Sequence, residues 1–554
     1  MKVLHLLLGA TALTATAAQA EPPRLVKKGT ATQLVVQGKP VLMLGGELGN
    51  SSASSATYMA PHWKRLKDMH VDTVLAPVQW EMIEPDEGRF DFSSVDQMLK
   101  DARANDLKLV ILWFGAWKNS MSTYVPSWVK RDAARFPRAQ LPNGQGVEIL
   151  SSMAPATLQA DQKAFAALMA HLKVVDDKQN TVLMTQVENE IGMLPVVRDY
   201  GPLADAAFKG PVPAELMTYL TQHRETLVPQ MKRLWEENGA KTSGTWAEVF
   251  GPGVAAEEVF TAWTYARFAN ELTRAGKAAY DMPMYVNVAF NRPGRLPGEY
   301  PSGGPLPHLI DVWKAGGPAI DFLSPDVYFP NFVDLVSGYK RPDNLLFIPE
   351  AHNASNPIAP ANAFYAIGQH DAIGFSPFSI ESIDEEPGAF KDAYAVLQQL
   401  KPYILDAQGT GRMAGFKPRQ LYDETLIYEP ETRDIGNYRF TIAYADIGKP
   451  LANPGADVSN SSEKAAIAAA SGIIIQTGPE DYLIAGQGIT VTFKPIGPGG
   501  ALAGIDSAYE GHFDAAGKWV PGRLLNGDQT HQGRHIRLFP GQWGIQKIRL
   551  YRYD

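Results

Sequence analysis

The sequence predicts a (β/α)8 barrel of the TIM type, followed by a C-terminal β-sandwich domain. Two changes of pattern along the chain support this prediction. Between about residue 40 and about residue 380, short apolar runs alternate with amphipathic, helix-like stretches. Beyond about residue 400, short β-like runs are separated by Gly and Pro turns. The first pattern is typical of buried parallel strands joined by helices, and the second of antiparallel sheets. We expect the barrel over residues 21–404 and the sandwich over residues 405–554.

Eight apolar runs are the expected barrel strands, because eight parallel strands close such a barrel. In chain order they cover residues 41–46, 73–79, 108–114, 181–187, 284–289, 320–328, 345–350 and 373–378. An open doubly wound sheet is the alternative. However, the segment after the first run, 45–50, reads GGELGN and lacks the G-x-G-x-x-G spacing of a phosphate-binding loop. In a barrel the chemistry lies at the C-terminal ends of the strands.

The second half of the prediction depends on the last 150 or so residues. Strand-like runs cover residues 439–444, 472–477, 489–493, 535–538 and 544–551. Turn signals such as Gly478-Pro479 and Asn526-Gly527 separate them. The polar, Ala-rich stretch 459–470 is expected to be a surface loop or a short helix. We expect this domain to buttress the barrel, with polysaccharide binding as the alternative.

Composition excludes several classes of function. The chain has 51 basic and 59 acidic residues and a net charge of −8, which argues against binding nucleic acid through a basic surface. It has no cysteine, which excludes disulfides, thiolate metal sites and a cysteine nucleophile. The apolar fraction of 45% and charged fraction of 20% are typical of a globular protein.

The first 20 residues have the pattern of a signal peptide. Lys2 precedes an apolar stretch, and Ala18-Gln19-Ala20 matches an A-x-A cleavage site. A membrane anchor is the alternative, but no later run of about 18 apolar residues predicts a membrane span in the mature protein. We therefore expect a periplasmic or secreted protein.

Two of the predicted strands end in carboxylates. The fourth run ends in QVENEIG, residues 186–192, and the seventh ends at Glu350 in LLFIPEAHN, residues 345–353. Taken singly, the first could cap a helix and the second could form a surface salt bridge. Together they match glycoside cleavage, in which one carboxyl protonates the leaving oxygen and another, about 5 Å away, attacks the sugar carbon.

Two motifs resemble those of known β-galactosidases. Residues 80–92, WEMIEPDEGRFDF, are similar to the signature W-x-x-x-E-P-x-x-G-x-[FY]-D-F of glycoside hydrolase families 35 and 42, which belong to a retaining (β/α)8 clan. Residues 186–192 resemble the family 35 motif Q-x-E-N-E-Y-G. The chain is therefore identified as resembling family 35, in a divergent bacterial branch. It departs from the family at Ile191, which replaces a Tyr, around Glu350, where T-E-F-W is usual, and after the first strand, which lacks the usual His-Tyr and Arg.

This resemblance implies roles for individual residues. Glu190 would be the general acid/base and Glu350 the nucleophile. Asn189 would hydrogen-bond the sugar 2-hydroxyl, and Tyr328 would hydrogen-bond the nucleophile, with packing as its alternative role. Glu188 is expected to be structural.

Further residues near the expected rim are candidates for contact with sugar. Sugar rings present an apolar face to aromatic rings and hydroxyl groups to polar side chains. We expect such contacts from Trp117, Lys118 and Asn119 beyond the third strand, from Trp80 in the second-strand signature, and from Trp246 in the long connection 188–283. A buried helix anchor is the alternative for Trp246. The histidines show no paired ligand spacing on a helix, so we expect no metal and no cofactor.

These observations predict a retaining β-galactosidase acting on oligosaccharides derived from plant polysaccharides, with xyloglucan side chains as one possible source. The alternatives are another glycosidase of the clan (a β-glucosidase, β-mannosidase or α-L-arabinopyranosidase) and a non-catalytic carbohydrate-binding protein. The expected partner is a carbohydrate, and the sequence does not predict an oligomeric state.

Overall fold

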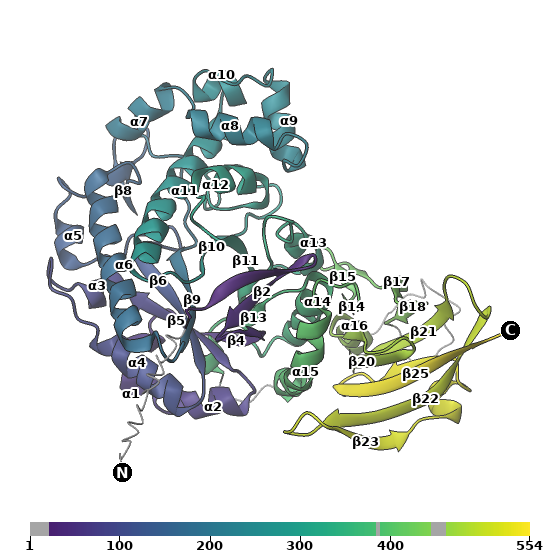
Figure 1. Cartoon of the computed structure of the whole chain (residues 1–554). Helices are drawn as coiled ribbons and strands as arrows, with labels where there is room; N and C mark the ends of the chain where they lie inside the picture. The colour runs from purple at the N-terminus through teal and green to yellow at the C-terminus, as the bar shows by residue number, and fades with distance from the viewer. Residues whose placement is uncertain (1–20, 384–387, 445–460) are drawn as a thin grey trace, which may run out of the picture.

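The computed structural model describes residues 21–383, 388–444 and 461–554 (Figure 1). The expected signal peptide, residues 1–20, lies outside the described residues. Eight parallel strands close into a barrel in the order β10-β11-β12-β13-β4-β5-β6-β9, and antiparallel sheets follow it. The predicted fold class is thus confirmed. The barrel strands are β4 (Met43–Glu47), β5 (Thr73–Gln79), β6 (Lys108–Lys118), β9 (Val182–Asn189), β10 (Met284–Ala289), β11 (Phe322–Val327), β12 (Ile348–Ala351) and β13 (Gly374–Pro377).

Alternation along the strands divides the barrel core into an inner and an outer layer. In β6, Val110, Leu112 and Phe114 join the cluster inside the barrel. Leu109, Ile111 and Trp113 join the larger cluster between strands and helices. Because successive side chains point to opposite faces, both faces of every barrel strand must be apolar. This is why the strands are continuous apolar runs in the sequence.

A small N-terminal sheet, which the sequence analysis did not predict, covers the bottom of the barrel. It consists of β1 (Arg24–Lys28), β2 (Ala31–Val36) and β3 (Lys39–Val41). Leu34 and Val36 of β2 pack in one cluster with Met43 and Phe322, the first residues of β4 and β11. The sheet therefore closes the end of the barrel opposite the C-terminal ends of its strands.

Helices surround the barrel and form a separate lobe after β9 (Figure 1). Helix α4 shows the principle, since its buried residues Val95, Met98, Leu99 and Ala102 follow the spacing of one helix face. The connection after β9 folds into a lobe of short helices and a long helix that returns to the barrel. These are α7 (Pro202–Lys209), α8 (Ala214–Gln222), α9 (Pro229–Glu237), α10 (Trp246–Phe250) and α11 (Val254–Ala279). The remaining barrel helices include α2 (His62–Asp68), α4 (Ser93–Ala104), α6 (Pro155–Asp176), α12 (Ile310–Gly316), α13 (Phe332–Ser337), α14 (Ala359–His370) and α15 (Gly388–Ala407).

The C-terminal part contains two antiparallel sheets that share a core. The four-stranded sheet has the order β17-β18-β21-β24 and the six-stranded sheet β14-β19-β20-β25-β22-β23. Phe440 and Val491 from the first sheet pack with Phe416, Ile474 and Ile484 from the second. Residues 461–468 of the stretch expected to be a loop or short helix form helix α16 (Ser461–Ala468). The strands are β14 (Met413–Phe416), β17 (Glu431–Ile435), β18 (Tyr438–Ala443), β19 (Ser471–Gln476), β20 (Asp481–Gln487), β21 (Ile489–Pro495), β22 (Leu502–Phe513), β23 (Trp519–Leu524), β24 (His535–Leu538) and β25 (Gly544–Tyr553).

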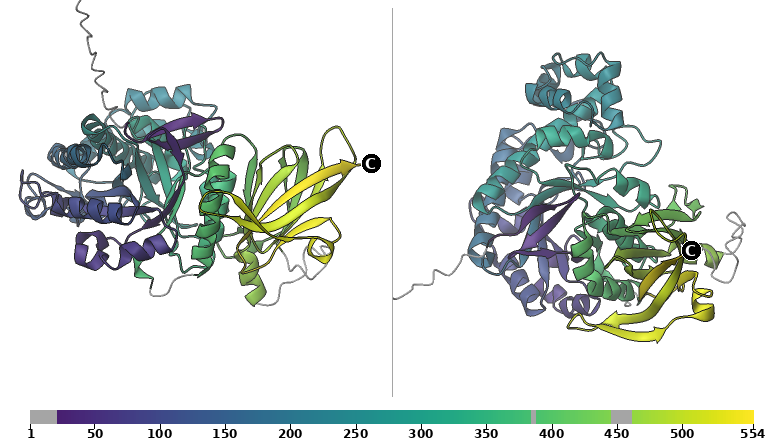
Figure 2. Two further views of the ribbon diagram at one scale, coloured as in Figure 1. Left: turned by 60° about the horizontal axis from the view of Figure 1, so that its bottom comes forward. Right: turned by 45° about the vertical axis from the view of Figure 1, so that its right-hand side comes forward.

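Helices α14 and α15 lie between the barrel and the C-terminal sheets, as the left view of Figure 2 shows. Ile473 and Ile475 on the outer face of the six-stranded sheet belong to the same core cluster as the barrel. Across this interface the Phe513 amide donates a hydrogen bond to Gln399 Oε1 at 2.8 Å. The rings of Phe364 and Trp543 are 4.6 Å apart. The C-terminal sheets therefore support the side of the barrel that carries β12 and β13. Among the described residues, no helix has the length and apolar character needed to cross a membrane.

Candidate active site

Three carboxyl groups meet at the C-terminal ends of the barrel strands. Oxygens of Glu190, Asp326 and Glu350 all lie within 4.8 Å of one another. Glu190 is 6% exposed and Glu350 is 4% exposed. The structure thus brings together the two carboxylates that the sequence analysis placed on different strands. Their spacing fits the separation of about 5 Å that retaining glycosidases use.

The backbone at the end of β9 directs the side chains of Glu188 and Glu190 to different surroundings. Glu188 and Glu190 have left-handed φ values of 61° and 45°, which are uncommon for side chains of this size. The Glu188 carboxylate accepts hydrogen bonds from the amides of Ala116 and Trp117 at 3.1 and 2.8 Å. Gly115 leaves room for this contact, since a Cβ there would lie 2.7 Å from Glu188 Oε1. Glu188 therefore ties β9 to β6, and Glu190 alone faces the carboxyl cluster.

Burial favours the protonated form of Glu190. Desolvation and then the nearby charge of Glu350 raise the pKa of Glu190 to about 7. The Glu190 amide donates to Asn287 Oδ1 at 2.9 Å. Asn119 donates a hydrogen bond from its side-chain amide to Glu190 Oε2. A carboxyl with this pKa can give a proton and take it back near neutral pH, as an acid/base must.

Glu350 has a phenol as its hydrogen-bond partner. Tyr328, one residue beyond β11, donates from its hydroxyl to Glu350 Oε1. His352 packs against the Tyr328 ring edge to face, with centroids 5.7 Å apart. A phenol at this position is a neutral donor that orients the carboxyl group. The structure therefore brings Tyr328 to the carboxylate that the sequence analysis paired with it.

Two polar residues of the predicted set are buried at the rim. Asn189 is fully buried, and neither polar atom of its side-chain amide has a hydrogen-bond partner among the described residues. Lys118 is also buried, with its ammonium group 5.1 Å from the centre of the Phe114 ring. The side chain of Asn189 thus retains hydrogen-bonding capacity for a ligand, and Lys118 supplies a positive charge to the carboxyl cluster.

The three predicted tryptophan contacts are wrong, because all three indole rings lie in the core. Trp117 is fully buried and packs edge-on against Tyr265 and Phe268 of α11, at 5.1 and 4.5 Å. The sequence analysis placed it beyond the third strand, but β6 continues to Lys118. Alternation then turns Trp117 outward beneath the helices and Lys118 toward the barrel mouth.

The other two rings are held by equally internal contacts. The Trp80 indole donates to Glu84 Oε2 at 3.0 Å and lies beside Trp128. Trp246 packs on Phe260 of α11 at 5.3 Å. Trp246 is therefore the helix anchor that was its alternative, and neither ring is available to a sugar.

Asp326, Asn287 and Glu47 join the site although the sequence analysis did not select them. Asn287 of β10 donates from its side-chain amide to Asp326 Oδ2 at 2.6 Å. Glu47 is the last residue of β4 and is buried next to Glu350. The available signal was a lone polar residue in or at the end of an apolar run, which is how Glu350 was found.

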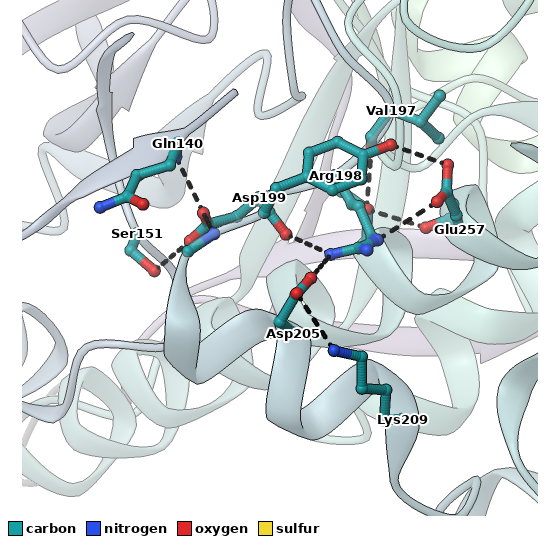
Figure 3. Close-up of polar contacts among 11 residues, drawn as sticks. Gln140, Ser151, Val197, Arg198, Asp199, Asp205, Lys209 and Glu257 are labelled. Atoms are coloured by element: carbon teal, nitrogen blue, oxygen red, sulfur yellow. Dashed lines mark hydrogen bonds and ion pairs between the residues drawn. The ribbon is translucent and has the colours of Figure 1, made fainter. Parts of the chain in front are cut away.

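The loop after Glu190 is anchored by a buried arginine. Figure 3 shows Arg198 between Asp205 and Glu257, which it contacts at 2.7 and 3.3 Å. The next residue, Asp199, accepts hydrogen bonds from the Gln140 amide at 2.9 Å and the Ser151 hydroxyl at 2.6 Å. These contacts join the loop to α7, α11 and the hairpin of β7 (Arg138–Gln140) and β8 (Gly146–Leu150). The network therefore holds the chain segment that carries Glu190.

The carboxyl cluster does not by itself establish a metal site. Carboxylate oxygens at this spacing are compatible with a divalent cation, but such clusters are also what glycoside cleavage requires. Lys118 already places a positive charge beside Glu190 and Glu47. We assign no metal to the cluster.

Comparisons with known proteins assign part of this barrel to a family. Residues 54–280 match the family model for glycoside hydrolase family 42, described as Beta-galactosidase, and residues 390–537 match a domain of unknown function, DUF5597. A Beta-galactosidase of Xanthomonas manihotis is 30% identical over 188 residues, which are 33% of this chain and 29% of that protein. This chain therefore matches less than a third of the length of that relative.

Solved structures give weaker similarity. The β-galactosidase from Marinomonas ef1 has a TM-score of 0.45 and 12% identity, covering 66% of this chain and 60% of that one. The catalytic domain of β-amylase from Paenibacillus polymyxa has a TM-score of 0.46 and 13% identity, covering 63% of this chain and 97% of that one. The comparisons do not show the assignment to family 35, although families 35 and 42 are related. The segment 54–280, which includes Glu190, is thus similar to the glycoside hydrolase family 42 domain.

Proposed function

We propose that the protein is a retaining β-galactosidase that removes terminal β-D-galactosyl residues. The observation that carries the proposal is the meeting of Glu190 and Glu350 within 4.8 Å at the mouth of the barrel. Their surroundings differ in the way the reaction requires. Burial favours a proton on Glu190, whereas Glu350 accepts a hydrogen bond from the Tyr328 phenol. The family 42 match over residues 54–280 supports the same activity.

In the first step a carboxylate oxygen of Glu350 attacks the anomeric carbon of the galactosyl residue. The glycosidic carbon–oxygen bond breaks, and the proton of Glu190 moves to the leaving oxygen. The products are a galactosyl ester of Glu350 and the free aglycone alcohol. Asn189, with its unpartnered amide, is placed to hydrogen-bond the sugar 2-hydroxyl as positive charge develops on the ring.

In the second step the ionised Glu190 takes a proton from a water molecule. The water oxygen attacks the anomeric carbon, and the bond to Glu350 breaks. Galactose leaves with its original configuration, Glu190 is protonated again and Glu350 is again a carboxylate. The second displacement therefore restores both groups, and the protein needs no other reactant.

The proposed substrates are oligosaccharides derived from plant polysaccharides, including galactosylated side chains of xyloglucan. The similarity of residues 186–192 to the family 35 motif keeps family 35 as our proposal for the family of this chain. We further propose that the protein is exported, to the periplasm or the exterior, because residues 1–20 have the pattern of a cleavable signal peptide.

A panel of nitrophenyl glycosides tests the activity, with the product anomer followed by proton NMR. We expect turnover of the β-galactoside with β-galactose released first, loss of turnover in Glu350→Gln, and slower but measurable turnover in Glu190→Gln, because nitrophenolate needs little help from an acid to leave. If a β-glucoside, β-mannoside or α-L-arabinopyranoside is hydrolysed faster than the β-galactoside, that glycoside replaces the β-galactoside as the proposed substrate. Release of the α-anomer first would reject the retaining mechanism, and no turnover of any glycoside would favour a binding protein.

A further inference from the structure

The barrel mouth contains more carboxyl groups than the proposed reaction uses. Glu47, Glu190, Asp326 and Glu350 are all buried there, with one ammonium group, that of Lys118. Among the described residues, the phenols of Tyr328 and Tyr285 also face the cluster; burial raises their pKa values, so both stay neutral. Two of the four carboxyls, Glu47 and Asp326, have no role in the two steps described above.

Asp326 lies between the two catalytic candidates. It is the direct neighbour of Glu350 in the parallel pairing of β11 and β12. Its carboxyl group also lies within 4.8 Å of an oxygen of Glu190. Asn287 donates to Asp326 Oδ2, whereas Oδ1 accepts no hydrogen bond from any described residue. A buried carboxyl oxygen that faces other carboxyls is stabilised when it carries a proton that it can donate.

Glu47 approaches Glu350 from the other side, from β4, which is two strands away from β12 in the barrel. It ends β4, and its Oε1 also lacks a hydrogen-bond partner among the described residues. Glu350 Oε2 is likewise unpartnered in that part of the chain, while Tyr328 holds Oε1. A proton shared between Glu47 and Glu350 would satisfy both carboxyls in a single contact.

Charge balance leads to the same protonation state. If all four carboxyls were ionised, four negative charges would face one positive charge from the described residues, that of Lys118, in a buried site. If Glu47, Asp326 and Glu190 hold protons, Glu350 alone is ionised and Lys118 balances it. Burial, together with the charge of Glu350, raises the pKa values of Asp326 and Glu47 well above their ordinary range.

We propose that Asp326 and Glu47 are positioning residues held as neutral carboxylic acids, with Asp326 donating a hydrogen bond to Glu190 and Glu47 donating one to Glu350. The roles of Glu190 and Glu350 here rest on the proposed function. Each donor stabilises the ionised form of its partner, which is Glu350 before the attack and Glu190 after it has given up its proton. Asp326 and Glu47 keep their own protons throughout the reaction.

The pH profile of kcat/KM shows whether Asp326 is a neutral acid, as proposed, or an ionised carboxylate. Asp326→Asn replaces a neutral donor by a neutral donor, so the basic limb, which reports Glu190, stays within about 0.3 pH unit of the parent. Asp326→Ala removes the donor and moves this limb to higher pH by about 1 unit. If Asp326 were ionised, Asp326→Asn would remove a negative charge and move the limb to lower pH, which would overturn the proposal.

Glu47 is tested by comparing two substitutions. Glu47→Gln keeps a neutral donor to Glu350, so it should retain more of the parental kcat/KM than Glu47→Leu, which removes the donor. Equal losses in the two variants would show that Glu47 does not act as a donor, against the proposal.

Infrared difference spectra provide a measurement that does not depend on turnover. With carboxyl-labelled Asp or Glu at neutral pH, Asp326→Asn and Glu47→Gln should each lose one protonated-carboxyl band. The control is Glu87→Gln, because Arg135 contacts Glu87 at 2.7 Å and lowers its pKa, so this variant should lose a carboxylate band. Loss of a carboxylate band from Asp326→Asn would overturn the proposal. An enzyme inactive on all glycosides that still loses the protonated bands would reject the proposed function and support the protonation states.

Discussion

Tyr328 reaches from the end of β11 to β12, where its phenol donates a hydrogen bond to Oε1 of Glu350. The two strands are parallel neighbours, and Asp326 and Val327 of β11 pair with Glu350 and Ala351 of β12. The phenol therefore extends over the adjacent strand end. Because it is a neutral donor to an ionised group, it stabilises the carboxylate that attacks and orients the attacking oxygen.

Replacing Tyr328 by Phe should lower kcat/KM for a β-galactoside by about 10- to 100-fold. This range corresponds to the about 1.5–3 kcal/mol that a hydrogen bond to a charged group contributes. Steady-state kinetics at the optimum pH measure the effect. Tyr58→Phe is the control, because Tyr58 is exposed on α1 (Ala56–Met59), and it should keep the parental rate. Parental kinetics in Tyr328→Phe would mean that this ring only packs against His352.

The pH dependence should show a basic limb near the pKa of Glu190, about 7. The acid must carry its proton to assist departure of the leaving group, so kcat/KM falls as the pH rises through this value. Glu190→Gln has no carboxyl group to titrate at this position, so its profile should lack the basic limb. An activated aryl galactoside is the substrate for this measurement, because its leaving group departs without help from an acid. A parental profile that falls only above pH 9 or so would contradict the assignment of Glu190 as the acid.

The barrel strands could be predicted because both faces of each strand are buried. All seven residues of β5 are buried, so the strand is a continuous apolar run in the sequence. Strands β22 and β23 were missed because most of their residues are exposed or half-buried and their sequences are mixed. Strand β1, with the sequence RLVKK, was missed for the same reason.

Within the site, the chemistry of single residues was predictable but the direction of side chains was not. Glu190 and Glu350 were found because each follows a predicted barrel strand and glycoside cleavage needs a pair of carboxyl groups. Trp117 was misplaced because the end of β6 determines which face its ring takes, and the sequence does not mark that end. Asp326 and Glu47 were overlooked because their importance comes from contacts with residues far away in the chain.

Trp117→Ala should affect stability and not sugar affinity. A fully buried tryptophan replaced by alanine lowers the free energy of unfolding by about 3–5 kcal/mol, because it leaves a cavity against Tyr265 and Phe268. Urea unfolding measures this change. Tyr551→Ala is the control, since Tyr551 is exposed on β25 and should change stability by less than about 0.5 kcal/mol. A raised KM with parental stability would restore Trp117 as a substrate contact.

Arg198→Ala should weaken both the fold and the activity, because Arg198 anchors the loop that follows Glu190. Its guanidinium is buried and contacts Asp205 and Glu257, and it stacks on the Tyr200 ring at 3.9 Å. Removing it leaves Glu257 without this cation and Asp205 with Lys209 alone, at 3.4 Å. We expect the free energy of unfolding to fall by about 3 kcal/mol. This value is at the lower end for a broken buried ion pair, because the Asp205 side chain is one-third exposed.

The same change should lower kcat/KM by about 10- to 100-fold, since a small displacement of a catalytic group has effects of this size. Arg412→Ala provides the matched control. Arg412 contacts Asp406 at 2.8 Å, but their side chains are 36% and 70% exposed, so the free energy of unfolding should fall by less than about 1 kcal/mol with no change in rate. Thermal unfolding and kinetics on both variants separate the two arginines. Equal, small effects would show that the loop keeps Glu190 in place without Arg198.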